Sequence, residues 1–536
     1  MHQQHRGGEL CNVSDIVGWQ VDDGRGSARA VVADDAVLTY DELRRQINRA
    51  GHLLHDLGVR REQRVLLVLG DTSVFPVLFL GAIRIGAVPV PVSPLDKDEN
   101  LRHFLDDSYA ELVVTDAPMV ERLRSACDGP TVRWLARGVS GPGITELDGG
   151  LSAQSDELDP ASTHRDDMAF WLYSSGSTGK PKGVVHLQHD MYVTCESYAE
   201  RVLGLQPEDV AFSTTKLFHA YGLGNGLSFP FWAGATAVYM SGPPKPALIV
   251  EMLRKHRPSV FFSVPALFAA IGREEDARDA LGSVRFCVSA AEPLPTTTIE
   301  RWRNTFNLEI VDGIGSTEML HIYCSNRPGE IHPGSSGWPV PGYDVRLVDD
   351  EGVVIDGPAV GALQVRGDSC AAYYWHQHEK TKASMIGSWF ATGDRYERRE
   401  DGTYVYVGRA DDMLKIGGLW VSPVDMEHVL REHPSVTDVG VVGVRAGDIS
   451  RIAAFVEVAA GIGDETLAGE LRTWCKERMR RYEYPHIVEF VESLPRTLTG
   501  KVQRFRLREW ASDAATHQQA AETADGVATM SNVQER

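Results

Sequence analysis

The sequence YSSGSTGKPKG at residues 173–183 is the segment that indicates the fold most directly. It follows the apolar run AFWLY, which predicts a buried strand. Small and hydroxyl-bearing residues let a backbone approach a polyphosphate closely, and Lys180 and Lys182 add positive charge. It is not the GxxxxGK[ST] loop, because Ser174 replaces the first glycine and Pro181 replaces the final Ser or Thr. The segment predicts a phosphate-binding loop in an α/β fold, and a flexible surface loop is the alternative.

The chain before this loop alternates helical and strand-like segments. Thr39 precedes a stretch with helical apolar spacing, and Glu42 three residues later completes a capping-box pattern. Buried-strand patterns occupy 64–71, 87–94 and 111–118. Strand, helix and strand at this spacing predict βαβ units, so we expect a large α/β body.

The composition changes near residue 408, where a charged, glycine-rich run precedes a helix, two strands, a second helix and a further strand. We therefore expect an N-terminal body over 1–410 that carries the loop, and a compact α+β domain over 411–512. Residues 513–536 have little apolar pattern, which predicts a disordered tail.

Bulk composition narrows the functional classes. The net charge of -20 argues against nonspecific nucleic-acid binding, which requires a basic surface. Seven dispersed cysteines without a CxxC pair predict reduced thiols in the cytoplasm and no zinc site. The polar N-terminus lacks a signal-peptide pattern, and the apolar stretch 74–92 is interrupted by Pro, Gly and Arg. We expect no membrane association, and read 74–92 as helix, turn and strand.

Further motifs accompany the loop in a fixed order. They are GIGSTE at 313–318, WFATGD at 389–394, GRADDMLKIGG at 408–418 and PRTLTGKVQR at 495–504. Together with the loop they closely resemble the superfamily of acyl- and aryl-CoA synthetases, peptide-synthetase adenylation domains and luciferases, over about residues 38–510. The resemblance implies an α/β fold: a large adenylate-forming body with mixed sheets and helices, and a small, mobile α+β C-terminal domain.

Finer features resemble the benzoate-CoA ligase branch of this superfamily. These are KLFHAYGLGNG at 216–226, SAAEPLP at 289–295, DGIGSTEMLHIY at 312–323 and GLWVSPVDME at 418–427. His219 departs from the branch, which usually has a second aromatic residue there. Ile314 replaces the tyrosine that stacks on adenine in much of the superfamily, but isoleucine is common in this branch.

The resemblance implies ATP- and Mg²⁺-dependent conversion of an aromatic acid, of the benzoate or substituted benzoate class, to an acyl-adenylate. The acyl group would then pass to the thiol of CoA, releasing AMP and pyrophosphate. The alternative acceptor is the phosphopantetheine of a carrier protein acting in trans. A dinucleotide oxidoreductase is disfavoured, since Glu318 occupies the third glycine position of a GxGxxG motif. Luciferase-type oxygenation and fatty-acyl activation fit less well, and a homodimer is left open.

The resemblance assigns the nucleotide site residue by residue. Thr317 would contact the α-phosphate and Glu318 would ligate Mg²⁺, a hard cation that suits carboxylate oxygens. Asp394 would accept hydrogen bonds from the ribose, assisted by Arg409. The loop residues are Ser174, Ser175, Gly176, Ser177, Thr178, Gly179, Lys180 and Lys182. The remaining nucleotide-binding residues are Ala291, Glu292, Pro293, Asp312, Gly313, Ile314, Gly315 and Ser316.

The resemblance also assigns the acid pocket and the moving parts. Lys501 would reach the substrate carboxylate as the catalytic lysine, and Asp411 would be the hinge. Gly417 and Gly418 would line the pantetheine tunnel, and His219 would act as a catalytic residue at its gate. The residues bordering the aromatic ring would be Ala220, Tyr221, Gly222, Gly315, His321 and Ile322.

Overall fold

A computed structural model provides the fold. It describes residues 9–126, 132–174, 180–274, 276–409, 414–416, 419–446, 449–458, 463–480, 483–496 and 502–511. The chain divides into two compact units. The first comprises Met1–Arg346, Gln364–Thr392 and Arg398–Val405, and the second comprises Leu347–Leu363, Gly393–Glu397 and Tyr406–Arg536. The predicted boundary at residue 410 and the predicted tail at 513–536 lie outside the described residues, so the domain limits stay predictions.

A five-stranded parallel sheet in the order β4-β3-β5-β6-β7 forms one part of the first unit. Its strands are β3 (Arg64–Val68), β4 (Val88–Val92), β5 (Leu112–Asp116), β6 (Arg133–Arg137) and β7 (Ile144–Glu146). Its helices are α2 (Tyr40–Asp56), α3 (Val74–Arg84), α4 (Asp98–Ser108), α5 (Ala117–Ala126) and α6 (Leu147–Ser152). The predicted capping box is confirmed, because Thr39 accepts from the Glu42 backbone while the Glu42 side chain accepts from Thr39. The stretch 74–92 is helix, turn and strand, as predicted.

A nine-stranded sheet in the order β16-β15-β14-β13-β12-β10-β11-β1-β2 forms the centre of the same unit. Its strands are β1 (Arg29–Val32), β2 (Val37–Thr39), β10 (Val210–Ser213), β11 (Thr236–Val238), β12 (Val260–Ser263), β13 (Phe286–Ser289), β14 (Ile310–Gly315), β15 (Ile322–Ser325) and β16 (Trp338–Pro339). The six strands from β1 to β14 in this order are parallel, and antiparallel strands extend both ends.

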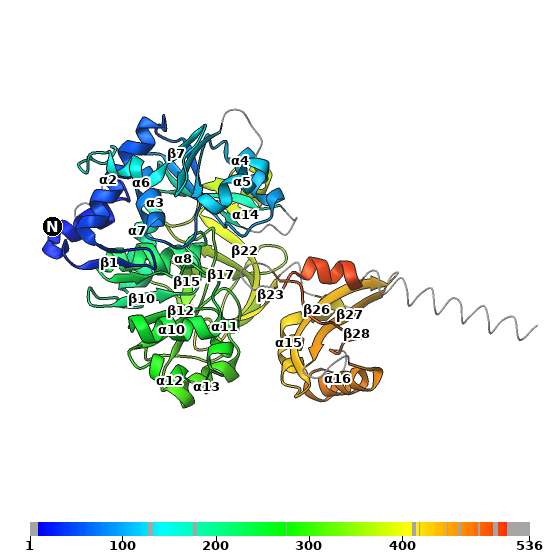
Figure 1. Ribbon diagram of the computed structural model, residues 1–536. Helices are drawn as coiled ribbons and strands as arrows, with labels where there is room; N and C mark the ends of the chain where they lie inside the picture. The colour runs from blue at the N-terminus through cyan, green and yellow to red at the C-terminus, as the bar shows by residue number, and fades with distance from the viewer. Residues whose placement is uncertain are drawn as a thin grey trace, which may run out of the picture. The chain divides into compact units, whose positions relative to one another are not determined.

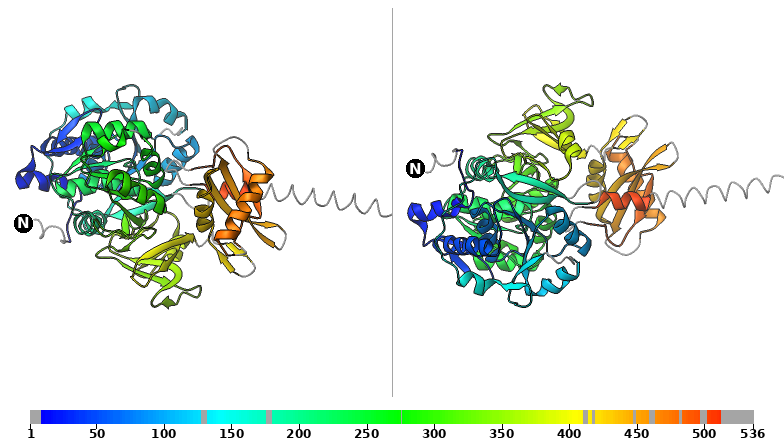
Figure 2. Two further views of the ribbon diagram at one scale, coloured as in Figure 1. Left: turned by 90° about the horizontal axis from the view of Figure 1, so that it is seen from below. Right: turned by 90° about the horizontal axis from the view of Figure 1, so that it is seen from above.

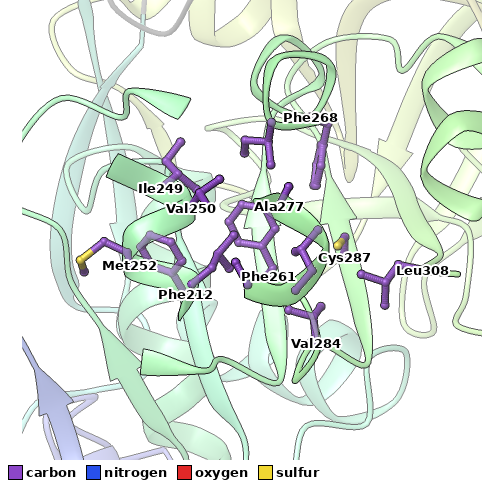
Figure 3. Packing of buried hydrophobic residues seen from close by; sticks show 14 of the residues in the cluster. Phe212, Ile249, Val250, Met252, Phe261, Phe268, Ala277, Val284, Cys287 and Leu308 are labelled. Atoms are coloured by element: carbon purple, nitrogen blue, oxygen red, sulfur yellow. The ribbon is translucent and has the colours of Figure 1, made fainter. Parts of the chain in front are cut away.

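Helices α10 (Pro246–His256), α11 (Pro265–Ile271), α12 (Ala277–Ala280) and α13 (Thr296–Phe306) connect the central strands (Figure 1). Their apolar faces pack on the sheet in one buried cluster, in which Phe261 of β12 lies among side chains such as Ile249 and Phe268 (Figure 3). Burying this surface holds the carboxyl ends of neighbouring parallel strands in register at one edge, where α/β sheets bind ligands.

A small antiparallel sheet, β20-β9-β8, carries the strands that flank the predicted phosphate loop. Its strands are β8 (Met168–Ser174), β9 (Lys182–Leu187) and β20 (Tyr373–Tyr374). The predicted strand before the loop is therefore confirmed.

Further helical segments of this unit are α1 (Asp15–Gln20), η2 (Val21–Arg25), α7 (Asp190–Thr194), η3 (Cys195–Glu200), α8 (Ala220–Leu223), η4 (Gly224–Ser228), α9 (Phe229–Ala233) and α14 (His378–Ser384). The remaining strands before residue 410 are β17 (Asp344–Val348), β18 (Val354–Ile355), β19 (Ala359–Arg366), β21 (Met385–Ile386), β22 (Trp389–Arg398) and β23 (Tyr404–Arg409).

The second unit contains a three-stranded sheet, β26-β27-β28, with helices on both faces (Figures 1 and 2). Its elements are β24 (Leu414–Ile416), β25 (Leu419–Val421), α15 (Pro423–Arg431), β26 (Val436–Ala446), β27 (Ile449–Val458), α16 (Glu465–Arg478) and β28 (Ile487–Phe490), and residues 504–511 are helical. Because strand side chains alternate, Val441 packs with α15 and α16, whereas Val442 packs with Leu507 of the last helical segment. Within the described part of the chain, no helix combines the length and apolar character needed to cross a membrane.

Candidate active site

The strands β8 and β9 bring the two ends of the predicted phosphate loop together. Ser174 pairs with Lys182 across the antiparallel strands, and Tyr173 pairs with Gly183. The hydroxyl of Ser174 is buried without a hydrogen-bond partner among the described residues, and Lys180 is exposed. Five predicted loop residues lie outside the described residues: Ser175, Gly176, Ser177, Thr178 and Gly179.

A buried ion pair joins β9 to the turn after β14. Lys182 Nζ lies 2.8 Å from Glu318 Oε1, and the Tyr374 hydroxyl donates to the same oxygen at 2.8 Å. The ammonium also lies 3.9 Å from the centroid of the Tyr374 ring, which favours the cation further. Burial raises the pKa of Glu318, but Lys182 and the Tyr374 hydroxyl outweigh it, so the carboxyl pKa is lowered. The structure thus holds an ionised carboxylate beside the loop.

The turn that carries Thr317 is held by its own backbone and by β9. The Thr317 carbonyl accepts from the Leu320 amide at 3.1 Å and lies 2.8 Å from His186 Nε2. Ser316 Oγ accepts from the Met319 amide at 3.2 Å. The Thr317 side chain is half-buried in this turn, immediately before the buried Glu318.

Asp312 on β14 carries a buried carboxyl with an unsatisfied oxygen. Its Oδ1 has no hydrogen-bond partner among the described residues, and Ser289 of β13 lies opposite it in the sheet. Burial raises the pKa of Asp312 well above its usual value. An amino group on a flat base would satisfy this oxygen, which fits the predicted adenine contact.

The neighbouring strand ends bring the other predicted nucleotide residues to the same edge of the sheet. Ala291 and Pro293 are exposed and Glu292 is half-buried, just after β13. Ala291 has φ of 81°, a left-handed conformation that non-glycine residues rarely adopt and that often marks a functional turn. The remaining members lie on or just after β14: Gly313, Ile314, Gly315 and Ser316.

His321 is the centre of a buried polar contact near α8. Its Nε2 lies 3.1 Å from Asn225 Oδ1 and 3.3 Å from the Tyr221 carbonyl, so this nitrogen carries the proton. Burial lowers the pKa of His321 to about 3, so the ring is neutral at ordinary pH. Its ring packs on Phe229, with centroids 4.4 Å apart.

Small residues keep the backbone close around this histidine. A Cβ on Gly315 would lie 2.4 Å from the His321 carbonyl oxygen, and one on Gly222 would lie 2.1 Å from the Lys216 carbonyl oxygen. Ala220 and Ile322 are buried, and the Tyr221 hydroxyl donates to the Val288 carbonyl at 2.9 Å. The structure therefore brings the predicted ring-binding residues together from α8, β14 and the start of β15.

His219 directly precedes α8 in a tightly anchored segment. Its carbonyl accepts from the Leu223 amide at 2.7 Å. The segment is anchored by Asp71, whose Oδ1 accepts from the Leu217 amide at 3.1 Å and whose Oδ2 lies 3.6 Å from Lys216 Nζ. Burial raises the pKa of Asp71 to about 6.

Two of the predicted nucleotide-binding residues lie among the described residues of the second unit. Arg409 Nη1 donates to Asp394 Oδ1 at 3.1 Å, so the two predicted ribose-binding residues are in contact. Four other predicted residues of this unit lie outside the described residues: Asp411, Gly417, Gly418 and Lys501.

Sequence reasoning did not identify several polar residues at this site. His186, Asp190, Asn225 and Tyr374 make the contacts described above or bond directly to the residues that do. His186 lies four residues after Lys182 on β9 and therefore faces the same side, but no strand was predicted there. Tyr374 had no local signal, since it lies 56 residues from Glu318 in the chain.

Two family models match most of the chain. Residues 19–375 match the model of AMP-binding enzymes, and residues 425–501 match the model of the AMP-binding enzyme C-terminal domain.

Individual relatives match over nearly the whole length. The benzoate–CoA ligase of Thauera aromatica is 43% identical, over 92% of this chain and 95% of the relative. The 4-hydroxybenzoate–CoA/benzoate–CoA ligase of Rhodopseudomonas palustris is 40% identical, over 92% of this chain and 93% of the relative. The solved structure of the anthranilate CoA ligase AuaEII in complex with anthranoyl-AMP is 35% identical, with a TM-score of 0.89 over 96% of this chain and 99% of that one.

Proposed function

Because the chain belongs to the AMP-binding enzyme family, we propose that it activates an aromatic carboxylic acid with ATP and transfers the acyl group to CoA. In the first step a carboxylate oxygen bonds to the α-phosphorus of ATP while the bond to the bridging oxygen breaks and pyrophosphate leaves. In the second, the CoA sulfur bonds to the acyl carbon, its proton is released and AMP leaves. The names of the relatives at 43% and 40% identity support the benzoate class of acid.

The observation that carries the adenylation proposal is the buried pair of Lys182 and Glu318 beside the loop. Attack of one anion on another requires charge neutralisation and alignment more than covalent chemistry from the protein. Lys182 supplies positive charge at the end of the loop, and the depressed pKa of Glu318 keeps a carboxylate available.

Glu318 is also the residue that would hold Mg²⁺. Lys182 and Tyr374 both bond to Oε1, and an ionised carboxylate suits a hard cation. Among the described residues, no three acidic, histidine or cysteine side chains gather into a metal site, so phosphate oxygens would complete the coordination. When bound, Mg²⁺ would neutralise charge on the phosphates.

The other nucleotide contacts are assigned to each unit separately. Thr317 would donate to the α-phosphate, and the unsatisfied oxygen of Asp312 would accept from the adenine amino group. Asp394 and Arg409 would bind the ribose, and the loop residues the outer phosphates. Lys501 would approach the substrate carboxylate after movement about Asp411, whereas Gly417 and Gly418 would admit the thiol arm in the second step.

The aromatic ring of the acid would lie against Tyr221, His321, Ala220, Gly222 and Gly315. His321 is neutral there, so the pocket favours an uncharged ring over a second charged group. His219, immediately before α8, would gate the thiol path.

Pyrophosphate release tests the proposal. The panel is benzoate, 2-aminobenzoate, 3-hydroxybenzoate, 4-hydroxybenzoate, cinnamate and a fatty acid, each with Mg²⁺ and ATP, with and without CoA. Release with an aryl acid that CoA makes multiple-turnover supports an aryl-CoA ligase and identifies its substrate. Release that CoA does not accelerate indicates the carrier-protein acceptor, and no release with any acid refutes the proposal. An acid-free reaction controls for ATP hydrolysis.

We further propose that the enzyme acts in the cytoplasm, which the six described free cysteines support. Light scattering after size-exclusion chromatography would distinguish a monomer from a homodimer.

A further inference from the structure

His186 is a fully buried histidine with both ring nitrogens engaged. Nδ1 lies 2.8 Å from Asp190 Oδ2, and Nε2 lies 2.8 Å from the Thr317 carbonyl oxygen. The His186 and Asp190 side chains are both 0% exposed. None of the roles described so far uses this pair.

The Thr317 carbonyl determines which nitrogen of His186 donates to it. A carbonyl oxygen only accepts, so His186 Nε2 donates to Thr317. On the other side of the ring, Asp190 Oδ2 contacts Nδ1 and also accepts from the Leu187 amide at 3.1 Å. The Thr317 carbonyl and the Asp190 carboxyl therefore hold the His186 ring from its two nitrogens.

The surroundings leave the His186 ring one orientation. Phe170 of β8 stacks on it with centroids 5.3 Å apart and an interplanar angle of 24°. The other Asp190 oxygen, Oδ1, lies 3.4 Å from His189 Nε2, and His189 Nδ1 contacts the Arg165 carbonyl at 2.8 Å. A ring held on its face and at both nitrogens is a rigid donor to the Thr317 carbonyl.

His186 lies on the same strand as Lys182, and the two residues hold neighbouring residues of the proposed phosphate site. His186 follows Lys182 by four residues, and residues i and i+4 of a strand face the same side. Lys182 bonds the side chain of Glu318, and His186 bonds the backbone of the preceding residue, Thr317. One strand thus holds both residues that would contact the α-phosphate and Mg²⁺.

We propose that His186 and Asp190 are positioning residues for the adenylation step, which set the Thr317 carbonyl and thereby aim the Thr317 hydroxyl and the Glu318 carboxylate. This role rests on the proposed function of the site. Outer partners that orient such groups typically contribute about 10–100-fold to activity.

Two substitutions separate the two hydrogen bonds. A glutamine amide reaches the position of the histidine Nε2, so His186→Gln keeps the bond to Thr317. An asparagine amide reaches only the position of Nδ1, so His186→Asn keeps the bond to Asp190 and loses Thr317. Val185→Ala is the matched control. Val185 is buried on the opposite face of the same strand, where it packs in the hydrophobic cluster that contains Trp171.

The measurement is kcat and KM for ATP in pyrophosphate release, with whichever of the four benzoates in the panel the wild type uses, alongside the melting temperature. We expect His186→Asn to lower kcat by about 10–100-fold and His186→Gln to lower it by a smaller factor, because glutamine keeps the bond to Thr317 and loses only the contact to Asp190. Val185→Ala should lower the melting temperature without changing kcat. Equal kcat for the two His186 variants, or a loss in His186→Asn no larger than in Val185→Ala, would overturn the positioning role.

A spectroscopic measurement separates this inference from the proposed function. Nitrogen-15 histidine labelling, with His186→Asn for assignment, should show one imidazole whose proton lies on Nε2, the nitrogen that faces the Thr317 carbonyl. A wild type inactive with every acid would refute the proposed function, and the spectrum would then decide the inference. A His186 ring without a proton on Nε2 would overturn it.

Discussion

Replacing Tyr374 by phenylalanine tests how the carboxylate of Glu318 is kept ionised. The change removes the hydroxyl that donates to Glu318 Oε1 at 2.8 Å and keeps the ring on which the Lys182 ammonium lies. The loss therefore isolates one hydrogen bond to a buried charge.

The size of the effect follows from that bond. A hydrogen bond to a charged group contributes about 1.5–3 kcal/mol, and one pKa unit corresponds to about 1.4 kcal/mol. Tyr374→Phe should therefore raise the pKa of Glu318 from its lowered value. A carboxyl whose folded pKa is depressed stabilises the fold above its unfolded pKa, and this stabilisation is lost as pH falls through the folded pKa. The variant should lose about 1.5–3 kcal/mol of this stabilisation at neutral pH.

The assay is the pH dependence of kcat/KM for ATP between pH 5 and 9, with unfolding by urea in parallel. The acid limb, where Glu318 becomes protonated, should move to higher pH in Tyr374→Phe. Tyr40→Phe is the control, because its buried hydroxyl donates to the Ala235 carbonyl at 2.6 Å, and it should lose stability without moving the acid limb. An acid limb that stays in place in Tyr374→Phe, or moves equally in the control, would refute the reasoning.

Three other substitutions test the remaining assignments. Lys501→Ala should lower adenylation by about 10²–10³-fold while calorimetry shows near-normal ATP binding, and undiminished pyrophosphate release would remove Lys501 from catalysis. Asp411→Pro should spare pyrophosphate release in a single turnover and block thioester formation, whereas loss of both steps would contradict a hinge role. Because the folded pKa of Asp71 is raised to about 6, its stabilising contribution is present below its unfolded pKa and is lost as pH rises through about 6. The stability of wild type relative to Asp71→Asn should therefore fall by roughly 3 kcal/mol between pH 4 and 8, and a pH-independent difference in urea unfolding would contradict the raised pKa.

Local sequence patterns predicted the elements that depend on near neighbours. The capping box of Thr39 and Glu42, the β8 strand and the helix, turn and strand over 74–92 each follow from residue spacing or chain-breaking residues, and the structure contains all of them. The α/β class followed from their order, and the family from motifs with a fixed sequence.

Local sequence patterns could not predict contacts between residues that are far apart in the chain. Tyr374 meets Glu318 because β20 pairs with β9, and nothing near either residue encodes that pairing. The partners of His321 likewise depend on how α8 and η4 pack against β15. The roles assigned to individual site residues stay predictions, and those of Lys501 and Asp411 concern residues that the structure does not describe.

The spacing along β9 also limits how this region of the gene can vary. Lys182 and His186 reach neighbouring residues because four positions separate them on one strand face. Inserting or deleting one codon between them would turn one side chain to the opposite face, whatever residue was added or lost. Substitutions between the two positions can be absorbed by repacking, but a change of length cannot. Functional relatives should therefore align without gaps from Lys182 to His186, even where the intervening residues differ.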